Sequence, residues 1–510
     1  MLSDILAPLT DLDRQMFSVL VPRDHALRRA LELVPWDDFG KTLAIYYCAE
    51  VGRPAMPPVL MLKLEFLRYH FNLSDRQLIK RAETDVAFRY FLQIRYSERL
   101  PDPSLLSHFR GRLGETGFRQ VFNRVVRVAR QHGLVKDRLR LKDATHVIAN
   151  IAVPNALGLV AQARDQLLAA AEPFDELRVA GERINQGLLQ ERTAGQTDDQ
   201  RLLARVTHLQ EILRWVDALP PPEDAAVNRR WQRLVQQREV AHKILADREH
   251  PEAGDRTLSA VDPDARCGKH GDWYDGYLMD VTVDPDSEII TEVEVLPANG
   301  DEAADAARLV RREEACQGND IDQLSIDGIG YNGPMLRELE DPEGLALDVY
   351  VPPHPEAASD VFGPEKFVED SQRRVVTCPA GQTSRYRERE ERHHATIYRF
   401  HWQACASCAL QPQCMKDPPK KSGRSVRKND YEAEYQRARE KAKTPAYAAV
   451  RLEHAKVERK LGEVMNHHGG RRARYRGRWK VQVQELMACT AANIKRIVRL
   501  LSAPTAISTA

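Results

Sequence analysis

Residues 138–152 have the sequence RLRLKDATHVIANIA, and their pattern predicts the first strand of a sheet. Every second residue of a strand lies on the same face, which groups Leu139, Leu141, Asp143, Thr145 and Val147. That face is apolar except at Asp143. An unpaired carboxylate in apolar surroundings is costly, so a buried acid on a strand is usually either paired or functional.

The same alternation returns further along the chain. Residues 277–283 and 289–295 alternate on either side of the turn DPDSE, which predicts a hairpin. A helix, a strand ending at Asp327, a second helix and a further strand follow. This is the ribonuclease-H-like order of elements, and the predicted fold class is therefore α/β with a mixed-sheet core.

Helical regions precede and interrupt this core. Residues 1–135 are predicted to be mostly helical, with Ser74 as one N-cap and Ser104 or Asp102 as another. Arginines on the helix after Ser104 indicate either a DNA-contacting domain or a solvated face: Arg110, Arg112, Arg119, Arg124, Arg127 and Arg130. Residues 155–254 return to helical spacing and predict a helical hairpin inserted after the first strand.

The composition indicates a globular intracellular chain. Its 510 residues suggest about three domains or one core with large insertions, and the 43% hydrophobic content is enough for a sizeable core. No apolar run approaches the length of a membrane span, and no secretory signal is visible at the start. We therefore expect a cytoplasmic protein with no membrane partner. Its eight cysteines would be reduced there, so a cysteine cluster predicts a metal site before disulfides.

The C-terminal part is strongly basic. Residues 415–500 contain 23 Lys and Arg against 9 Asp and Glu, whereas the net charge of the whole chain is only +1. Within this part, the run GGRRARYRGRWK at 469–480 interleaves cations with aromatic rings. Cations suit phosphates and rings suit unstacked bases. The residues predicted to bind DNA here are Arg471, Arg472, Arg474, Tyr475, Arg476 and Lys480.

Four cysteines predict a structural zinc site. Cys405 and Cys408 form a CxxC pair, Cys378 precedes it, and Cys414 follows it. Two thiolates on a tight loop can bind one Zn²⁺, and two more complete a tetrahedral site. The alternative is four unrelated reduced cysteines. Cys48, Cys267, Cys316 and Cys489 lack such spacing, and we expect them to be packing residues.

Acidic residues on separate elements of the core predict a second metal site. Asp143 lies on the first strand and Asp327 at the end of the fourth, and a third acid on a later helix could meet them at one sheet edge. Three carboxylates there would repel one another unless cations joined them. An all-oxygen site suits Mg²⁺ or Mn²⁺. Two such ions can activate the attacking oxygen and stabilise the leaving oxygen during phosphoryl transfer.

Four blocks of the sequence resemble, in family order, a bacterial insertion-sequence transposase of the DDE class: LKDATHVIANIA, DPDARCGKHGDWYDGYLMDVTVD, LSIDGIGYNG and VERKLGEVMNHHGGRRARYRGRWKVQVQELMACTAANIKRI. The segment GRPAMPPVLMLKLEFLRYHFNLSDRQLIKRA resembles the helical N-terminal domain of such transposases. The resemblance covers most of residues 50–500. It maps the family's catalytic, metal-binding acids to Asp143, Asp327 and Glu458, and the aromatic residue after the second acid to Tyr331, which it implies is a DNA contact.

The resemblance implies an enzyme that cuts DNA at the terminal inverted repeats of an insertion sequence and joins the 3′ ends to target DNA. It also implies two Mg²⁺ or Mn²⁺ ions per active site and a homodimer or larger assembly on DNA, associated with the nucleoid. One alternative is an inactive DNA-binding descendant, against which the complete acid trio argues. Another is a nuclease of the same fold that hydrolyses without joining.

The choice of the third acid depends on one helix. Within 450–465, the core-facing stripe would leave Glu453 and Glu458 on opposite flanks and turn Glu463 to solvent. Geometry leaves both flanking acids open, and the resemblance selects Glu458. Arg451 and Met465 share its flank, so that flank is expected to face DNA. Many relatives have a lysine at the position of Met465, which leaves that DNA contact in doubt here.

These patterns divide the chain into six parts. We expect a helical DNA-binding domain at 1–135, a catalytic core at 136–154 and 255–352, and a helical insertion at 155–254. A Cys-rich, zinc-ribbon-like insertion would span 353–430. The catalytic helix and basic segment would span 431–500, and a tail would span 501–510.

Overall fold

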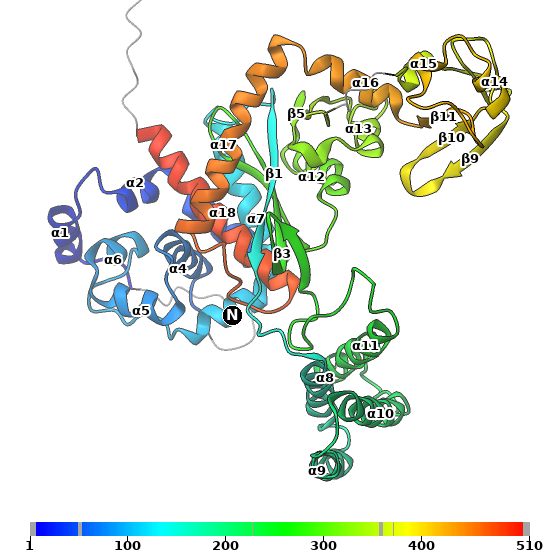
Figure 1. The fold of residues 1–510 in the computed structure, drawn as a ribbon. Helices are drawn as coiled ribbons and strands as arrows, with labels where there is room; N and C mark the ends of the chain where they lie inside the picture. Colours follow the sequence, from blue (N-terminus) through cyan, green and yellow to red (C-terminus); the bar gives the residue numbers. More distant parts are fainter. Residues whose placement is uncertain (1–6, 49–53, 227, 356–360, 371, 503–510) are drawn as a thin grey trace, which may run out of the picture.

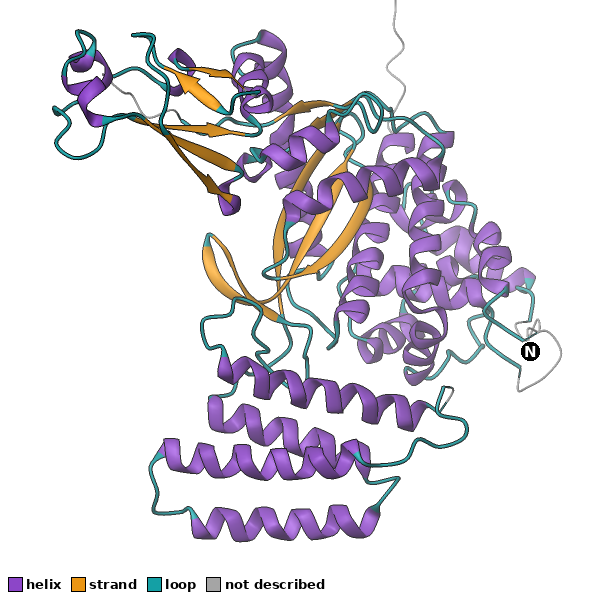
Figure 2. Ribbon diagram, turned by 90° about the vertical axis from the view of Figure 1, so that its right-hand side faces the viewer, coloured by secondary structure: helices purple, strands orange, loops and turns teal. Residues whose placement is uncertain are grey.

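The computed structural model describes residues 7–48, 54–226, 228–355, 361–370 and 372–502 (Figure 1). The predicted tail lies outside these residues from position 503 onward. A central sheet is joined to N-terminal helices on one side, to a helical insertion below and to the Cys-rich region at the top (Figure 2). Among the described helices, none is long and apolar enough to cross a bilayer.

The N-terminal region is helical, as the sequence predicts. Its helices are α1 (Asp11–Leu20), α2 (Ala26–Leu33), α3 (Trp36–Ala44), α4 (Pro58–His70), α5 (Asp75–Thr84), α6 (Val86–Leu92) and α7 (Ser104–Gln131). Ser74 caps α5 in a capping box with Gln77, which confirms that N-cap. At α7 the helix begins at Ser104, whose backbone N–H donates to the Asp102 carboxylate at 2.8 Å.

The arginines of α7 neither face solvent as a group nor form an open basic surface. Arg110 is buried between Glu65 and Asp75, and Arg119 donates to Glu292 and Glu294 of the sheet. Ion pairs also join Arg124 to Asp38 and Arg130 to Asp137. Neither a DNA-contacting helix nor a solvated face therefore describes α7 fully, because several of its arginines form ion pairs with other parts of the molecule.

The sheet is mixed, as predicted. Its strands are β1 (Arg140–Ile148), β2 (Arg266–His270), β3 (Asp272–Val283), β4 (Ile290–Pro297), β5 (Gln323–Ser325) and β6 (Asp348–Tyr350). β1 pairs antiparallel with β3 and parallel with β5, β6 runs parallel to β5, and β4 completes the predicted hairpin with β3. Strand β2, which extends the N-terminal half of β3 into a ribbon, has no apolar alternation and was not predicted.

Helices cover the sheet on both faces and along one edge. α12 (Glu302–Gln317) lies between β4 and β5, η1 (Gly328–Gly330) and α13 (Gly333–Leu339) follow β5, and α16 (Glu432–Lys441), α17 (Pro445–His467) and α18 (Arg478–Ser502) end the described chain. Asn493 and Gln482 of α18 bond to the backbone of β4 at Ile290 and Val295, so α18 satisfies an otherwise free sheet edge. One continuous apolar core joins the sheet, α17, α18 and the N-terminal helices.

The insertion after β1 contains four helices, whereas the sequence predicted a two-helix hairpin. They are α8 (Ala156–Ala171), α9 (Glu176–Arg192), α10 (Asp198–Asp217) and α11 (Arg229–Glu249). Their apolar residues form a core separate from that of the sheet. The helical spacing of the apolar residues correctly predicts helices in this region, but it does not show how many helices there are.

The Cys-rich region has a small β core of its own around Phe367, Val376, Tyr398, Phe400 and Val426. Its elements are η2 (Pro364–Lys366), β7 (Val368–Asp370), β8 (Val375–Thr377), β9 (Tyr386–Glu390), η3 (Glu391–His393), β10 (Ala395–Arg399), α14 (Trp402–Ala406), α15 (Gln411–Cys414) and β11 (Ser425–Asn429). β9, β10 and β11 form one sheet, and β7 and β8 form another. The predicted insertion is therefore a compact folded unit.

Candidate active site

Asp143 lies in the middle of the central strand, on the face covered by α17. It sits opposite Val281 of β3, and its neighbour Leu141 pairs with Ser325 of β5. Its carboxylate accepts one bond, from the backbone N–H of Ala144 at 2.9 Å. Burial, followed by the negative charges of Asp327 and Glu458, raises the pKa of Asp143 to about 7. Asp327 and Glu458 are thus close enough to Asp143 to act on its charge.

Asp327 follows β5 by two residues and caps the turn that leaves the sheet. Its carboxylate accepts from the backbone N–H of Ile329 at 3.2 Å. Gly330 is required for packing rather than for an unusual backbone angle, since a Cβ there would lie within 3 Å of Ile326 and Val351. The parallel pairing of β1 with β5 therefore brings Asp327 to the edge beside Asp143.

Helix α17 is fastened to the end of β5 just before Asp327. The guanidinium of Arg451 donates to the carbonyl of Ile326 at 2.8 Å and to the Ser325 hydroxyl at 3.3 Å. His454 lies 3.0 Å from that hydroxyl, and burial lowers its pKa to about 4. This anchor fixes the rotation of α17, and it leaves Glu458 exposed two turns after Arg451.

The other flanking acid, Glu453, forms ion pairs with two cations. Its carboxylate lies 2.9 Å from Arg138 and 3.6 Å from Lys456. The geometry of the helix therefore favours Glu458 over Glu453 as the acid that faces the sheet edge.

Two expectations for α17 were wrong. Glu463 is not solvated, because α18 covers that side of the helix and the carboxylate pairs with Lys460 and Lys495 at 2.7 Å each. The imidazole of His468, 3.8 Å away, and these two lysines hold the pKa of Glu463 far below the usual range. Met465 does not face outward with Arg451 either. It is buried in the main core, so no DNA contact arises from that position.

Glu302 is a fourth acid near the edge that sequence reasoning missed. It begins α12, and its charge adds to those that raise the pKa of Asp143. Burial raises the pKa of Glu302 itself, Lys142 opposes the shift, and Asp327 adds to it. Acids are common in the first turn of a helix, where they offset its dipole, so the sequence carries no signal that sets Glu302 apart.

The acidic edge suits divalent cations by its chemistry. Only oxygen donors gather there, and within the described residues no Lys or Arg forms an ion pair with Asp143, Asp327 or Glu458. Burial is the largest cause of the raised pKa of Asp143, and the negative charges of Asp327 and Glu458 add to it, so a nearby cation would lower it. In the described part of the chain, however, no three His, Cys, Asp or Glu side chains converge closely enough to hold a metal ion as they stand.

The basic run divides into buried and exposed residues. Residues 471–473 pair with the end of β1, so that Arg471 donates to the carbonyl of His146 at 2.7 Å and to Thr145 on the face of Asp143. Arg474 donates to Leu73 and Asn72 of the N-terminal helices. The ring of Tyr475 lies beneath the guanidinium groups of Arg68 and Arg110.

The remaining predicted DNA contacts differ in exposure. Arg472, Arg476 and Lys480 are exposed, and Lys480 lies 5.5 Å from the ring of Trp479. Tyr331 is half-buried, with its ring against Tyr435 of α16 and against His354.

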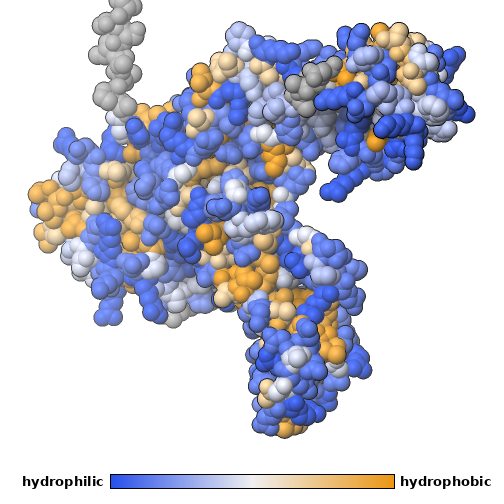
Figure 3. Space-filling model, in the orientation of Figure 1, coloured by the Kyte–Doolittle hydropathy of each residue, from blue (hydrophilic) through white to orange (hydrophobic). Residues whose placement is uncertain are grey.

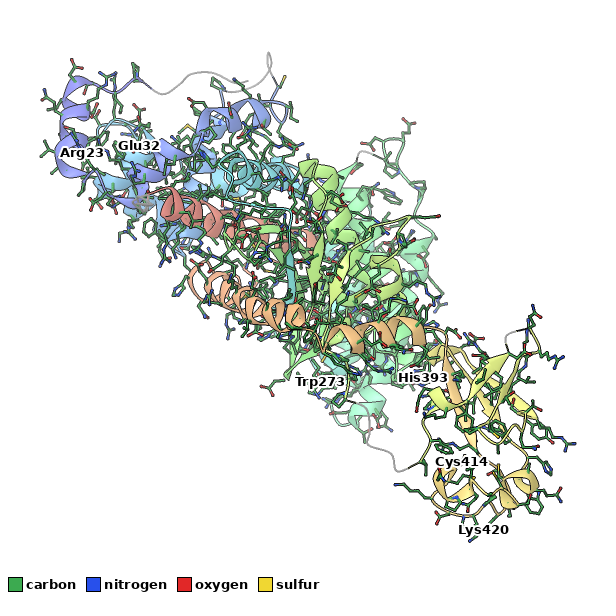
Figure 4. The ribbon with its side chains drawn as sticks, turned by 90° about the horizontal axis from the view of Figure 1, so that it is seen from above. Arg23, Glu32, Trp273, His393, Cys414 and Lys420 are labelled. Carbon is green, nitrogen blue, oxygen red and sulfur yellow. The ribbon has the colours of Figure 1, made fainter. Side chains whose placement is uncertain are left out.

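The four predicted zinc ligands come together in the Cys-rich region. Cys378, Cys405, Cys408 and Cys414 line one pocket, together with Phe367 and Phe400. Neighbouring thiols and burial raise the pKa of Cys414, and the Cys405 sulfur accepts from the backbone N–H of Arg424 at 3.5 Å. Cys414 lies at the opposite end of the molecule from Arg23 and Glu32 of the N-terminal helices (Figure 4). A preformed zinc site is not confirmed, because the described thiols do not meet at coordinating separations.

Two parts of the chain match models of known protein families. Residues 15–112 match the model described as Transposase domain (DUF772), and residues 377–498 match the model described as Transposase DDE domain. The second match contains Glu458 but begins after Asp143 and Asp327.

A relative and the solved structures add little detail. An uncharacterised protein, ORF8 in the nfe locus of Rhizobium meliloti, is 27% identical over 128 residues, which cover 25% of this chain and 61% of that protein. The chain thus spans about three fifths of that relative's length. No solved structure matches the chain. The chain is thus similar to a transposase domain near its N-terminus and to a transposase DDE domain in its C-terminal part.

Proposed function

We propose that this chain is a transposase that cleaves DNA at the terminal inverted repeats of its insertion sequence and joins the freed 3′ ends to target DNA. The observation that carries the proposal is the gathering of acids at the sheet edge, where the charges of Asp327 and Glu458 act on the largely buried carboxyl of Asp143. Stability alone gives no reason to gather acids without cations. A transposase DDE domain that includes Glu458 supplies the class of reaction.

The three acids would hold two Mg²⁺ or Mn²⁺ ions. Bound there, the ions would activate the attacking oxygen and stabilise the leaving oxygen of a phosphodiester. Asp143 would provide a ligand from β1, Asp327 one from the turn after β5, and Glu458 one from α17. Arg471, held on the Asp143 face by Thr145 and His146, would position a DNA phosphate near these acids.

Further DNA contacts would come from Arg472, Arg476 and Lys480, which are exposed. Tyr331, Arg474 and Tyr475 were also predicted to bind DNA. We propose that they stabilise the structure around the site instead of contacting DNA. Arg474 and Tyr475 do so by joining the basic segment to the N-terminal helices. We further propose a structural Zn²⁺ on Cys378, Cys405, Cys408 and Cys414, because four sulfur donors around one pocket suit that ion. Two or more copies would act together on the two ends of the element.

The test of the catalytic assignment compares glutamates on α17. Glu458→Gln should abolish cleavage of a labelled inverted-repeat substrate in Mg²⁺ while binding of the uncut DNA persists. Glu453→Gln is the matched control and should stay active, since its partner is Arg138. An inactive Glu453→Gln beside an active Glu458→Gln would contradict the assignment. Joined products, rather than cut ends alone, distinguish a transposase from a nuclease.

The zinc proposal has its own measurement. Metal analysis of purified protein should find about one zinc per chain. Cys408→Ser should lose this metal and become sensitive to proteolysis between residues 361 and 430. Cys489→Ser, which alters a buried cysteine of the main core, is the control and should keep the zinc. Metal-free wild-type protein with an intact Cys-rich region would refute the proposal.

A further inference from the structure

A two-stranded ribbon extends from the central sheet beyond the last residue of β1. It consists of β2 and the first part of β3, which turn into one another at Gly271. The φ of this residue is +73°, a left-handed angle that glycine adopts without strain. Residues 269–273, the tip of the ribbon, are all exposed. Figure 2 shows the ribbon reaching away from the sheet between the Cys-rich region and the helical insertion, so its tip is accessible to another molecule.

The tip carries a large exposed ring next to a cation. Trp273 is 71% exposed, and the amine of Lys269, its partner across the ribbon, lies 5.9 Å from the centre of the indole ring. Asp272 points to the opposite face of the ribbon, and Asp275 is half-buried beside Cys267.

The surroundings of this ring are polar. Figure 3 shows a largely hydrophilic surface, on which hydrophobic residues gather over the N-terminal helices and the helical insertion. The other residues of the tip are polar or glycine, so Trp273 is surrounded there by polar groups rather than by an apolar patch of the kind that binds proteins. An exposed ring beside a cation suits a nucleic acid better.

The register of the sheet places this ring on the same side as the acids. Paired residues of antiparallel strands point to the same face, and Asp143 is paired with Val281 of β3. Position 273 is an even number of residues from position 281, so Trp273 shares that face, which α17 covers. Tyr274 instead faces His146 on the other side of the sheet, with ring centres 5.1 Å apart. Figure 4 also shows Trp273 on the side of the sheet where α17 lies.

Cations lie beside β1 between the acids and the ribbon. Arg471 donates to the Thr145 hydroxyl at 3.3 Å, and Arg472 pairs with the last residue of β1. Arg476 donates to a backbone carbonyl two residues further on, at 3.1 Å. Arg472 and Arg476 are exposed. A row of cations that leads from the acids to the ribbon suits the phosphates of a DNA duplex.

We propose that the tip of the ribbon enters the major groove of the DNA that the acids cut, with Trp273 against base edges and Lys269 at a phosphate. The major groove is wide enough to admit a two-stranded ribbon. Trp273 lies about 26 Å along β3 from the residue that pairs with Asp143. For a duplex that follows the row of arginines, at about 3.4 Å per base pair, the contact lies about eight base pairs from the cleaved phosphodiester. This inference rests on the proposed function, because it takes the acids as the place of cleavage.

Removal of the ring tests the contact. With no divalent metal present, Trp273→Ala should bind a duplex that carries an end of the element about tenfold more weakly than the wild type, which is the loss of one base contact. His270→Ala is the matched control, since it removes an exposed ring from the opposite face of the same tip, and it should bind as the wild type does. Neither variant should change the melting temperature, because both side chains are exposed. Equal affinities of the two variants would overturn the proposal.

Cross-linking tests the position of the contact. When p-benzoylphenylalanine replaces Trp273, irradiation should attach it to nucleotides about six to ten positions from the bond that the wild-type protein cuts. Cross-links elsewhere, or none, would refute the ribbon contact while cleavage by the wild type stands. A wild-type protein that binds the duplex but does not cut it would instead refute the proposed function, and this inference with it.

Discussion

Two neighbouring residues of β1, Lys142 and Asp143, have opposite electrostatic surroundings. Lys142 points toward α12, is 1% exposed and lies 2.9 Å from the carboxylate of Asp280. Asp143 points toward α17, where its charged neighbours are the acids Asp327 and Glu458. The charge on one face of the strand is thus paired, whereas Asp143 on the other face forms no ion pair among the described residues.

The difference separates stability from function. Arg140, on the same face as Lys142, is fully buried and donates to Glu313 at 2.7 Å. Pairs of this kind keep buried charges from destabilising the fold. The acids at the Asp143 edge form no such ion pair among the described residues, and solvent reaches Glu458. The proposed metal ions would supply the missing positive charge.

Substituting the two residues should give opposite results. Asp143→Asn should lower the rate of DNA cleavage by roughly four orders of magnitude, about 5.5 kcal/mol of transition-state stabilisation, with stability unchanged or increased. Lys142→Met leaves Asp280 buried without a cation and should lower the free energy of unfolding by about 3–5 kcal/mol. Cleavage assays and urea denaturation measure the two effects. Equal destabilisation by both variants would contradict the proposed difference between the two faces of β1.

The pH dependence of stability sharpens the same contrast. The folded-state pKa of Asp143 is raised from 3.8 to about 7, so the folded chain binds its proton more tightly than the unfolded chain does. The contribution to stability is complete below about pH 4 and is lost as the pH rises toward 7, on the order of 4 kcal/mol. Mg²⁺ should restore this contribution to the free energy of unfolding at pH 8 and have little effect on it at pH 5.

Thermal denaturation of wild type and Asp143→Asn, with and without Mg²⁺, measures this linkage. The asparagine variant should show a weaker dependence on pH between 4 and 7 and a weaker response to the ion. If wild type and variant respond alike, the charge at Asp143 is already compensated in the folded chain.

Two arginines of the basic run differ in their surroundings in a similar way, and the expected effects are smaller. Arg472 is exposed, whereas Arg474 donates to Leu73 and Asn72. Arg472→Ala should lower the slope of log affinity against log salt by about 0.9, the value for one lost phosphate contact. Arg474→Ala should change the slope less and the thermal stability more. DNA titrations at several salt concentrations provide the measurement, and a larger slope change for Arg474→Ala would contradict the division.

Sequence periodicity was sufficient for the main elements of the core. β1 and the β3–β4 hairpin form where alternation predicts them, because one face of each is buried against apolar neighbours. The core-facing stripe of α17, including Val450, Val457 and Leu461, is also confirmed. Such patterns report local burial, which is a property of the residues themselves.

Properties that depend on distant neighbours were not predictable in this way. Glu463 lies opposite the core-facing stripe of its own helix, and only the packing of α18 shows that it is paired. Arg474 and Tyr475 resemble DNA contacts in sequence, yet both contact helices near residues 68–73 and 110. Glu302 reaches the acidic edge because α12 begins there. In each case the decisive contact comes from a segment far away in the chain.

The separate core of the helical insertion has a consequence for the order of folding. β1 and β3 are divided by residues 149–271, and closing a flexible loop of that length costs about 4 kcal/mol in chain entropy. The insertion shortens this loop once it has folded, because the start of α8 and the end of α11 lie together around Val153, Leu159, Ile244 and Leu258. Early formation of the four helices would bring the two strands into register before they pair. The insertion would then act as an internal folding aid, and slow or faulty assembly of its helices would delay the sheet on which the acids depend.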